Sequence, residues 1–294
     1  MIREKTELAG ILMKDLTGED KWTKKKNIAR QLDWCLVGFA ILGGVLVMLP
    51  LLALLNITFS QIADIPYLLE IATQKQVINA ILLTFAAGLV AVFILLIFGT
   101  PLAYVLARTH SRANQVIESI IDLPLVLPHT VAGLMVYILF MQRGLIGAPF
   151  KQLGIVFEDA FPGIVVAMIF VSTPFYVNSV REGFQKVPVH MENVARTLGA
   201  TRFRAFLLIV LPSSIRHILN GSILAWGRGI SEFAAIIMIA YYPMVISTLI
   251  YYDFTTGGIK ESTAVAFVMI VVCLGVFLVL RTLTRFVGRY DDRV

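Results

Sequence analysis

The sequence predicts an all-α protein that crosses a membrane about six times. Of its 294 residues, 58% are hydrophobic and only 15% are charged, whereas a soluble domain carries about 45–50% apolar and about 25% charged residues. The mean hydropathy of +0.82 departs in the same direction. The apolar residues also gather in blocks near the length of one bilayer crossing, about 20 residues. These observations exclude a soluble enzyme with one core, a disordered chain and a disulfide scaffold.

Six apolar blocks define the predicted spans. They cover residues 32–57, 77–107, 123–141, 161–180, 205–240 and 262–286. The second and fifth blocks are longer than a straight crossing, so we expect tilt, a kink or extension beyond the bilayer. The blocks form a predicted transmembrane domain over residues 32–286, with a polar extension at 1–31 and a tail at 287–294.

The N-terminal extension is polar and strongly charged. We do not interpret it as a signal peptide, because the apolar block that follows is too long and has no A-x-A cleavage site after it. Its segment W-T-K-K-K-N-I-A-R, residues 22–30, predicts either a basic interfacial helix or a solvated charge run.

The distribution of basic residues predicts the orientation. Of the 25 Lys and Arg residues, 20 lie in segments 1–31, 108–122, 181–216 and 281–294, and four lie in the connections between those segments. Basic residues near span ends favour the cytoplasmic side. We therefore expect a multi-pass protein of the cell membrane with both termini in the cytoplasm.

The sequence contains no motif for covalent chemistry. It has no G-x-x-x-x-G-K-[ST] phosphate loop, no H-E-x-x-H zinc motif and no G-x-S-x-G nucleophile elbow. The longest cytoplasmic connection, residues 181–204, is too short for an ATPase domain. We expect a transporter subunit that is not an enzyme, has no metal or cofactor of its own, and depends on another chain for any ATP hydrolysis.

The fifth block carries two charges inside an apolar span. Arg228 and Glu232 are four residues apart, so they share a helix face and can pair. A charge at the bilayer centre costs at least about 2.5–3.5 kcal/mol and usually has a reason. The pair either fixes internal packing or borders a solute path. Ser231 places a hydroxyl beside it.

The third block begins with a predicted break. Pro124 and Pro128 each remove a helical donor and clash with the preceding turn. Non-helical backbone at membrane depth is tolerated where it is buried in protein or lines a cavity. The segment with Pro128 and the following Thr130 is therefore either a wall of the path or a kinked packing helix.

The connection at 181–204 predicts a short amphipathic helix over residues 189–198. Gly199 follows it and is a favourable residue for a helix C-terminus. This helix presents apolar and charged side chains to the cytoplasm, and an ordinary surface loop is the alternative interpretation.

The same segment resembles the EAA loop of ABC importer permeases, E-A-A-x-x-x-G-x(9)-I-x-L-P. Five positions match at the family spacing, namely Ala195, Gly199, Ile209, Leu211 and Pro212. The chain departs from the pattern where Asn193-Val194 stands for Glu-Ala, with Glu192 one residue upstream. The resemblance covers about residues 32–285 and implies the type I importer fold. It also implies that Val189, Glu192, Asn193, Ala195, Leu198 and Gly199 form the coupling surface for an ATPase subunit.

Two further segments resemble the oxyanion branch of this family. They are D-L-P-L-V-L-P-H-T-V-A-G at 122–133 and R-G-I-S-E-F-A at 228–234, and the run A-Y-Y-P-M at 240–244 is most similar to molybdate/tungstate permeases. The resemblance implies a second copy of this chain, two cytoplasmic ATPase subunits that bind ATP and Mg²⁺, and an extracellular oxyanion-binding protein. A sulfate permease is the competing interpretation.

A path for a dianion should offer hydroxyls and backbone donors with little net charge, because strong fixed cations would trap the cargo. We therefore predict that Pro128, Thr130, Arg228, Ser231 and Glu232 line the path or its gate. A secondary transporter or channel would need more ionisable residues than these spans contain. An intramembrane enzyme would need a nucleophile–base or metal set that the sequence does not reveal.

Overall fold

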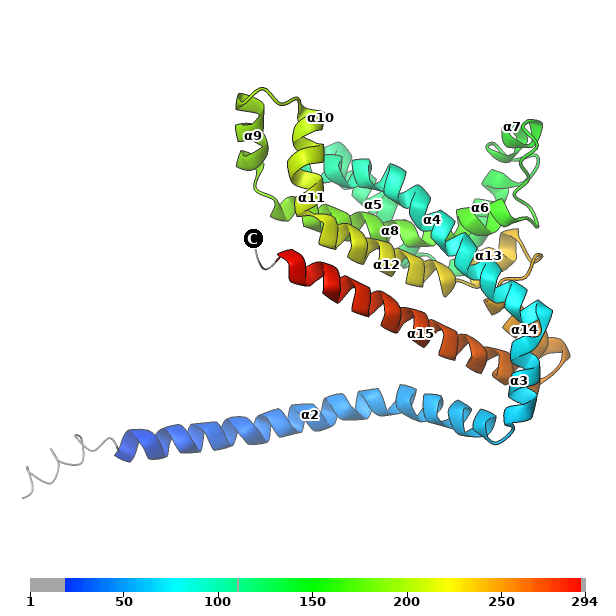
Figure 1. Cartoon of the computed structure of the whole chain (residues 1–294), viewed down its shortest axis with the longest axis horizontal. Helices are drawn as coiled ribbons and strands as arrows, with labels where there is room; N and C mark the ends of the chain where they lie inside the picture. The colour runs from blue at the N-terminus through cyan, green and yellow to red at the C-terminus, as the bar shows by residue number, and fades with distance from the viewer. Residues whose placement is uncertain (1–18, 110, 292–294) are drawn as a thin grey trace, which may run out of the picture. The chain divides into compact units, whose positions relative to one another are not determined.

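The computed structural model describes residues 19–109 and 111–291, and no strand occurs among them (Figure 1). Residues 1–18 of the predicted extension and 292–294 of the predicted tail lie outside the described residues. The chain divides into two compact units, Met1–Ala63 and Asp64–Val294.

The described part of the first unit is one long helix, α2 (Glu19–Ile62). Its segment Leu36–Ile62 is apolar and long enough to cross a membrane. Apolar side chains along it are exposed, including Leu46 and Leu49, each 79% exposed. Residues 22–30 belong to the same helix, and their place at the membrane interface stays a prediction.

Three helices form the centre of the second unit. They are α4 (Lys75–Arg108), α8 (Phe161–Lys186) and α12 (Ile215–Ile230), which pack against one another (Figure 1). Small residues allow the close approach: a Cβ at Gly99 would lie 2.8 Å from Tyr176 Cδ1. The buried Tyr176 hydroxyl is 2.7 Å from Thr100 Oγ1, so its polar atom has a partner inside the apolar core.

The third predicted span is a bent pair of helices. The helix axis bends by 118° between α5 (Arg112–Val126) and α6 (His129–Phe140). The break falls at Leu127 and Pro128. Leu127 is extended, because a residue that precedes proline avoids the α region. The predicted break is confirmed at Pro128, but the break expected at Pro124 is wrong, because α5 continues through that residue. Most of α5, however, lies in the predicted connection at 108–122, because apolar length alone does not reveal an amphipathic helix.

The fifth predicted span is interrupted twice. It begins with α10 (Arg202–Ala205), the π-helical η1 (Phe206–Val210) and α11 (Leu211–Ser213). The helix axis bends by 71° between this part and α12. The second interruption separates Ile230 from α13 (Ala234–Ile239). The kink expected from the length of this block is therefore confirmed.

The described part of the second unit has five further helices: α3 (Ile65–Thr73), α7 (Gly147–Gln152), α9 (Val189–Thr197), α14 (Ile246–Thr256) and α15 (Ile259–Asp291). Helices α3, α14 and α15 share an apolar cluster with the start of α4, around Ile71, Val77, Leu249 and Val265. One buried bond also ties α14 to α4, because the Ile246 N–H donates to Thr84 Oγ1 at 2.9 Å.

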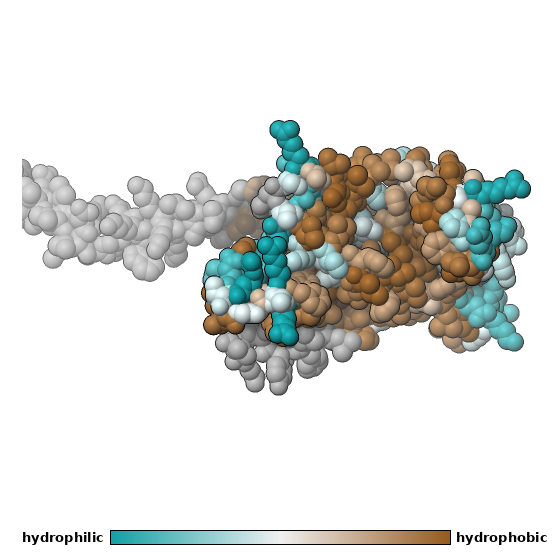
Figure 2. All heavy atoms as spheres, turned by 90° about the horizontal axis from the view of Figure 1, so that it is seen from above, coloured by the Kyte–Doolittle hydropathy of each residue, from teal (hydrophilic) through white to brown (hydrophobic). Residues whose placement is uncertain are grey.

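The predicted all-α class is confirmed. The described residues contain four continuous helices that are long and apolar enough to cross a membrane, or up to six spans if each bent pair counts as one. The surface agrees with this assignment. Figure 2 shows apolar side chains over the middle of the visible face and hydrophilic side chains gathered toward its ends.

Candidate functional site

The two broken spans meet at their breaks. Helices α6 and α13, which follow the breaks, pack against each other. Their backbones are so close that a Cβ at Gly133 would lie 2.7 Å from the Ala235 Cα. Glycine is therefore required at this contact. The close approach also brings together polar side chains of His129 and Arg228, which are 99 residues apart in the sequence.

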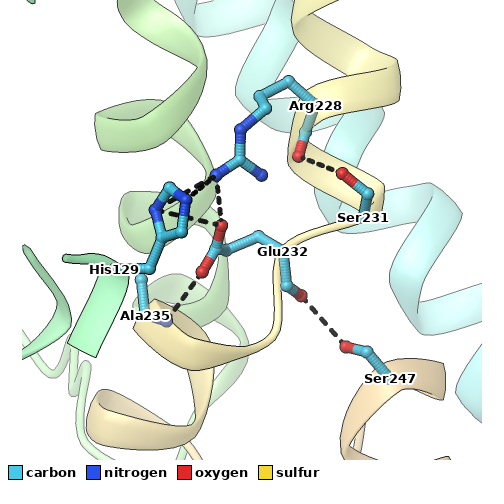
Figure 3. Close-up of polar contacts among 6 residues, drawn as sticks. All are labelled: His129, Arg228, Ser231, Glu232, Ala235 and Ser247. Carbon is cyan, nitrogen blue, oxygen red and sulfur yellow. Dashed lines mark hydrogen bonds and ion pairs between the residues drawn. The ribbon is translucent and has the colours of Figure 1, made fainter. Parts of the chain in front are cut away.

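Arg228 and Glu232 form the predicted ion pair (Figure 3). Arg228 Nη2 donates to Glu232 Oε2 at 2.6 Å, and the two side chains are 19% and 2% exposed. The other carboxylate oxygen, Oε1, accepts the Ala235 N–H at 2.8 Å. The Ser247 hydroxyl donates to the Glu232 carbonyl oxygen at 3.0 Å. Glu232 therefore neutralises Arg228 and also fixes the start of α13.

His129 is the third member of this cluster (Figure 3). It begins α6 directly after Pro128, and Arg228 Nη2 lies 3.2 Å from each of its ring nitrogens. Its Nδ1 is 3.8 Å from Glu232 Oε2, and its side chain is 47% exposed. We did not predict His129 as a site residue. Its position after a helix-breaking proline was the signal available in the sequence.

The two predicted hydroxyl positions are at the surface of the chain. Thr130 and Ser231 are both exposed, and Ser231 Oγ donates to the Arg228 carbonyl oxygen at 3.0 Å. Pro128 caps α6 and is also exposed. The arrangement therefore offers hydroxyls and a neutralised cation beside interrupted backbone. Among the described residues, no group of three or more His, Cys, Asp and Glu side chains is placed to hold a metal ion.

The predicted cytoplasmic helix is present as α9. Pro188 caps its beginning, Leu198 follows its last turn, and Gly199 has φ +93°. Its surface carries exposed apolar side chains, with Val189 53%, Val194 55% and Leu198 84% exposed. Of the other predicted coupling residues, Asn193 is exposed and Ala195 is half-buried. The predicted amphipathic helix with its terminal glycine is confirmed as a structural element.

Glu192 differs from its neighbours on α9 because its carboxylate points inward. Its side chain is 10% exposed, and Oε1 lies 2.5 Å from Arg108 Nη2. Its Oε2 accepts the Tyr104 hydroxyl at 2.6 Å. Neither Arg108 nor Tyr104 was predicted as a site residue, because each is more than 80 positions away along the chain.

Comparison with known proteins places these features in a family. The family of binding-protein-dependent transport system inner membrane components matches residues 99–290. The chain is 38% identical over 251 residues to the molybdate/tungstate transport system permease protein WtpB of Pyrococcus abyssi, which covers 85% of this chain and 96% of that protein. It is 29% identical over 227 residues to the sulfate transport system permease protein CysT of Synechocystis, covering 76% and 79%.

The fold is also similar to a solved importer. A chain of the bacterial alginate ABC transporter, solved in complex with its pentasaccharide-bound periplasmic protein, has a TM-score of 0.63 at 20% identity. The similarity covers 91% of this chain and 96% of that one. The matched family region, which covers more than half of the chain, therefore leads to one assignment. The chain belongs to the family of inner-membrane components of binding-protein-dependent transport systems, whose members are transporter subunits and not enzymes.

Proposed function

We propose that this chain is the membrane-spanning permease of an ATP-driven importer that brings molybdate and tungstate into the cytoplasm. The observation that carries the proposal is 38% identity, over 85% of the chain, to a protein named as a molybdate/tungstate permease. Three further relatives with that name are 37–38% identical over 87% of the chain. The polar cluster at the broken spans suits a divalent oxyanion.

The importer would be assembled around two copies of this chain. Two cytoplasmic ATPase subunits would bind ATP and Mg²⁺, and an extracellular binding protein would deliver the oxyanion. Both termini of the permease would lie in the cytoplasm. The apolar side chains exposed on α9, together with Asn193, Ala195 and Gly199, would dock on the ATPase subunit. Closure of the ATPases on ATP would then turn the cavity from inward-facing to outward-facing.

The path would run along the dimer axis past the breaks in the two spans. A dianion that leaves water needs donors in place of its hydration shell, but strong net positive charge would hold it too tightly. Thr130 and Ser231 supply exposed hydroxyls, and Glu232 neutralises Arg228 at 2.6 Å. These features support a weak, exchangeable site beside Pro128 over a tight binding site.

Substrate uptake tests the proposed cargo. The purified complex in proteoliposomes, supplied with its binding protein and internal ATP, should accumulate labelled molybdate and tungstate. An excess of unlabelled sulfate should compete poorly. Preferential uptake of sulfate would refute the proposed cargo and favour the second candidate, a sulfate importer. That candidate is supported by 31% identity over 257 residues to the sulfate permease CysT of Salmonella typhimurium.

Cross-linking tests the proposed path. Thr130→Cys or Ser231→Cys, in a chain without its native cysteines, should form a disulfide with its own copy in the dimer. A bulky thiol reagent at either position should block uptake. Thr84→Cys is the matched control. Thr84 lies on α4, is fully buried against α14 and should form no such disulfide. Lipid-facing behaviour of both test positions would refute the assignment of the path.

A further inference from the structure

The only acidic residue of α9 is held inside the permease. The helix has the sequence V-H-M-E-N-V-A-R-T, so Glu192 is its single carboxylate. That side chain is 10% exposed and contacts Arg108 Nη2 at 2.5 Å. It also accepts the Tyr104 hydroxyl at 2.6 Å. Charge-assisted contacts of this kind are short and geometrically restrictive, and this one leaves no exposed acid on the helix.

The partners of Glu192 belong to the cytoplasmic end of α4. Arg108 is the last residue of that helix, and Tyr104 lies one turn before it. Arg108 Nη2 also donates to the Val187 carbonyl oxygen at 3.1 Å, in the segment that leads into α9. One guanidinium therefore binds both the backbone before α9 and the side chain within it.

The tyrosine is itself fixed by aromatic packing. The Tyr104 ring is 5.8 Å from the ring of Phe184, near the end of α8. It is also 4.7 Å from the ring of Phe206, at the start of η1. The clamp, defined here as Tyr104, Arg108 and Glu192, is therefore connected to the elements on both sides of α9.

The space beside the clamp is open. A cavity of about 640 Å³ lies between the end of α4, α9 and α10, and the residues that line it include Pro101, Val105, Asn193, Arg196 and Phe203. Apolar packing alone therefore does not fill the gap between α9 and α4. The ion pair and the tyrosine hydrogen bond are the direct polar ties across it in the described residues.

We propose that Glu192 is a positioning residue that locks the coupling helix to α4, and not the residue through which the permease contacts its ATPase. This inference rests on the proposed function, in which α9 transmits the ATPase movement. The ATPase would meet the exposed apolar and basic side chains of α9, among them Val194, Arg196 and Leu198. Movement of α9 would reach α4 through the clamp.

The test uses the complete transporter in proteoliposomes. Glu192→Gln keeps the size of the side chain and an acceptor for Tyr104, but it removes the ion pair. Arg108→Gln removes the same pair from the other side. The measurements are ATPase co-purification and the number of oxyanions transported per ATP hydrolysed. Glu182→Gln is the matched control, because Glu182 lies near the same end of α8 in an exposed pair with Lys186, with 64% and 59% of the side chains exposed.

Both clamp variants should retain the ATPase subunit and hydrolyse ATP. Transport per ATP should fall about tenfold, the change expected for the loss of one charge-assisted contact. The double variant should be no worse than Arg108→Gln alone, because that change already removes the ion pair together with the bond from Arg108 to the Val187 carbonyl oxygen. The exchange of Arg108→Glu with Glu192→Arg should recover part of the coupling. The control should behave like the parent chain. A defect confined to folding would lower transport and hydrolysis together and leave their ratio unchanged.

Two results would overturn the proposal. One is loss of the ATPase subunit in Glu192→Gln but not in Arg108→Gln, which would make Glu192 a direct contact. The other is an unchanged ratio of transport to hydrolysis in both variants. Failure of the proposed function has a different signature, because the parent chain would then bind no ATPase. The clamp would still be measurable in that case as a non-additive stability effect in the isolated permease.

Discussion

Removal of Arg228 should destabilise the permease far more than removal of a surface cation that pairs with a carboxylate four residues away. Arg228→Met preserves length and helix propensity but leaves the Glu232 carboxylate, 2% exposed, without its partner. The companion change Glu232→Gln removes the charge and keeps an oxygen that can accept the Ala235 N–H, now 2.8 Å from Oε1. Together the two variants separate the cost of a stranded charge from the loss of packing.

The burial of the pair determines the size of the effect. Breaking a buried ion pair from one side costs about 3–5 kcal/mol, because an uncompensated charge remains. The Arg228 side chain is 19% exposed, so some water reaches the site, and we expect the lower end of that range, about 3 kcal/mol. The double variant should lie within about 1.5 kcal/mol of the parent chain, because no buried charge is left. Lys186→Met, which breaks an exposed pair at the same spacing, should cost no more than about 0.5 kcal/mol.

Reversible unfolding in mixed detergent micelles provides the measurement. The free energy of unfolding of the parent chain, both single variants and the double variant gives a double-mutant cycle. The reasoning requires a coupling free energy of at least about 1.5 kcal/mol between Arg228 and Glu232. It would be refuted if Arg228→Met cost as little as Lys186→Met, or if the double variant were as unstable as the sum of the singles.

Three further predictions concern Gly199 at the end of α9, Asp253 in α14 and the orientation of the chain. Gly199→Val should lower transport-coupled ATP hydrolysis while the membrane domain still folds. The space around Gly199 is open, but its φ of +93° strains a β-branched residue. Full coupling in that variant would contradict the prediction. Burial, with a smaller effect of Glu261, raises the pKa of Asp253 to about 6. The fold therefore favours the protonated acid, and thermal stability should fall as the pH rises from about 4 through about 6, a decline that Asp253→Asn should remove. The orientation can be tested in a chain without its native cysteines. Leu153→Cys should react with an impermeant maleimide from outside and Val116→Cys should not, although both sites are exposed, at 75% and 59%. The reverse pattern would invert the proposed orientation.

The sequence predicted those features that depend on local chemistry. Pro128 located the break in the third span, and the spacing of Arg228 and Glu232 predicted their pairing. Gly199 located the end of α9, which the structure confirms with its positive φ. In each case the signal lies within a few residues, so no tertiary information is needed.

Contacts between distant segments were not predictable in this way. The approach of His129 to Arg228 joins positions 99 residues apart. The clamp joins Glu192 to Tyr104 across 88 residues. Helix α5 was missed for another reason, because its polar residues pair with α8, as in the bond of 2.7 Å from Asn178 to Asp122, and polar helices give no long apolar block.

The anchoring of α4 at two widely separated points has a mechanical consequence. Arg108, the last residue of α4, pairs with Glu192 of α9, and Thr84, about seven turns away, accepts the hydrogen bond from the Ile246 N–H of α14. At 1.5 Å per residue these anchors are about 36 Å apart along the helix axis. A rod of that length that pivots by about 5° at one anchor carries the other through about 3 Å, comparable to the length of a hydrogen bond. A small rotation of α4 at its Arg108 end is thus sufficient to exchange one set of contacts for another near Thr84.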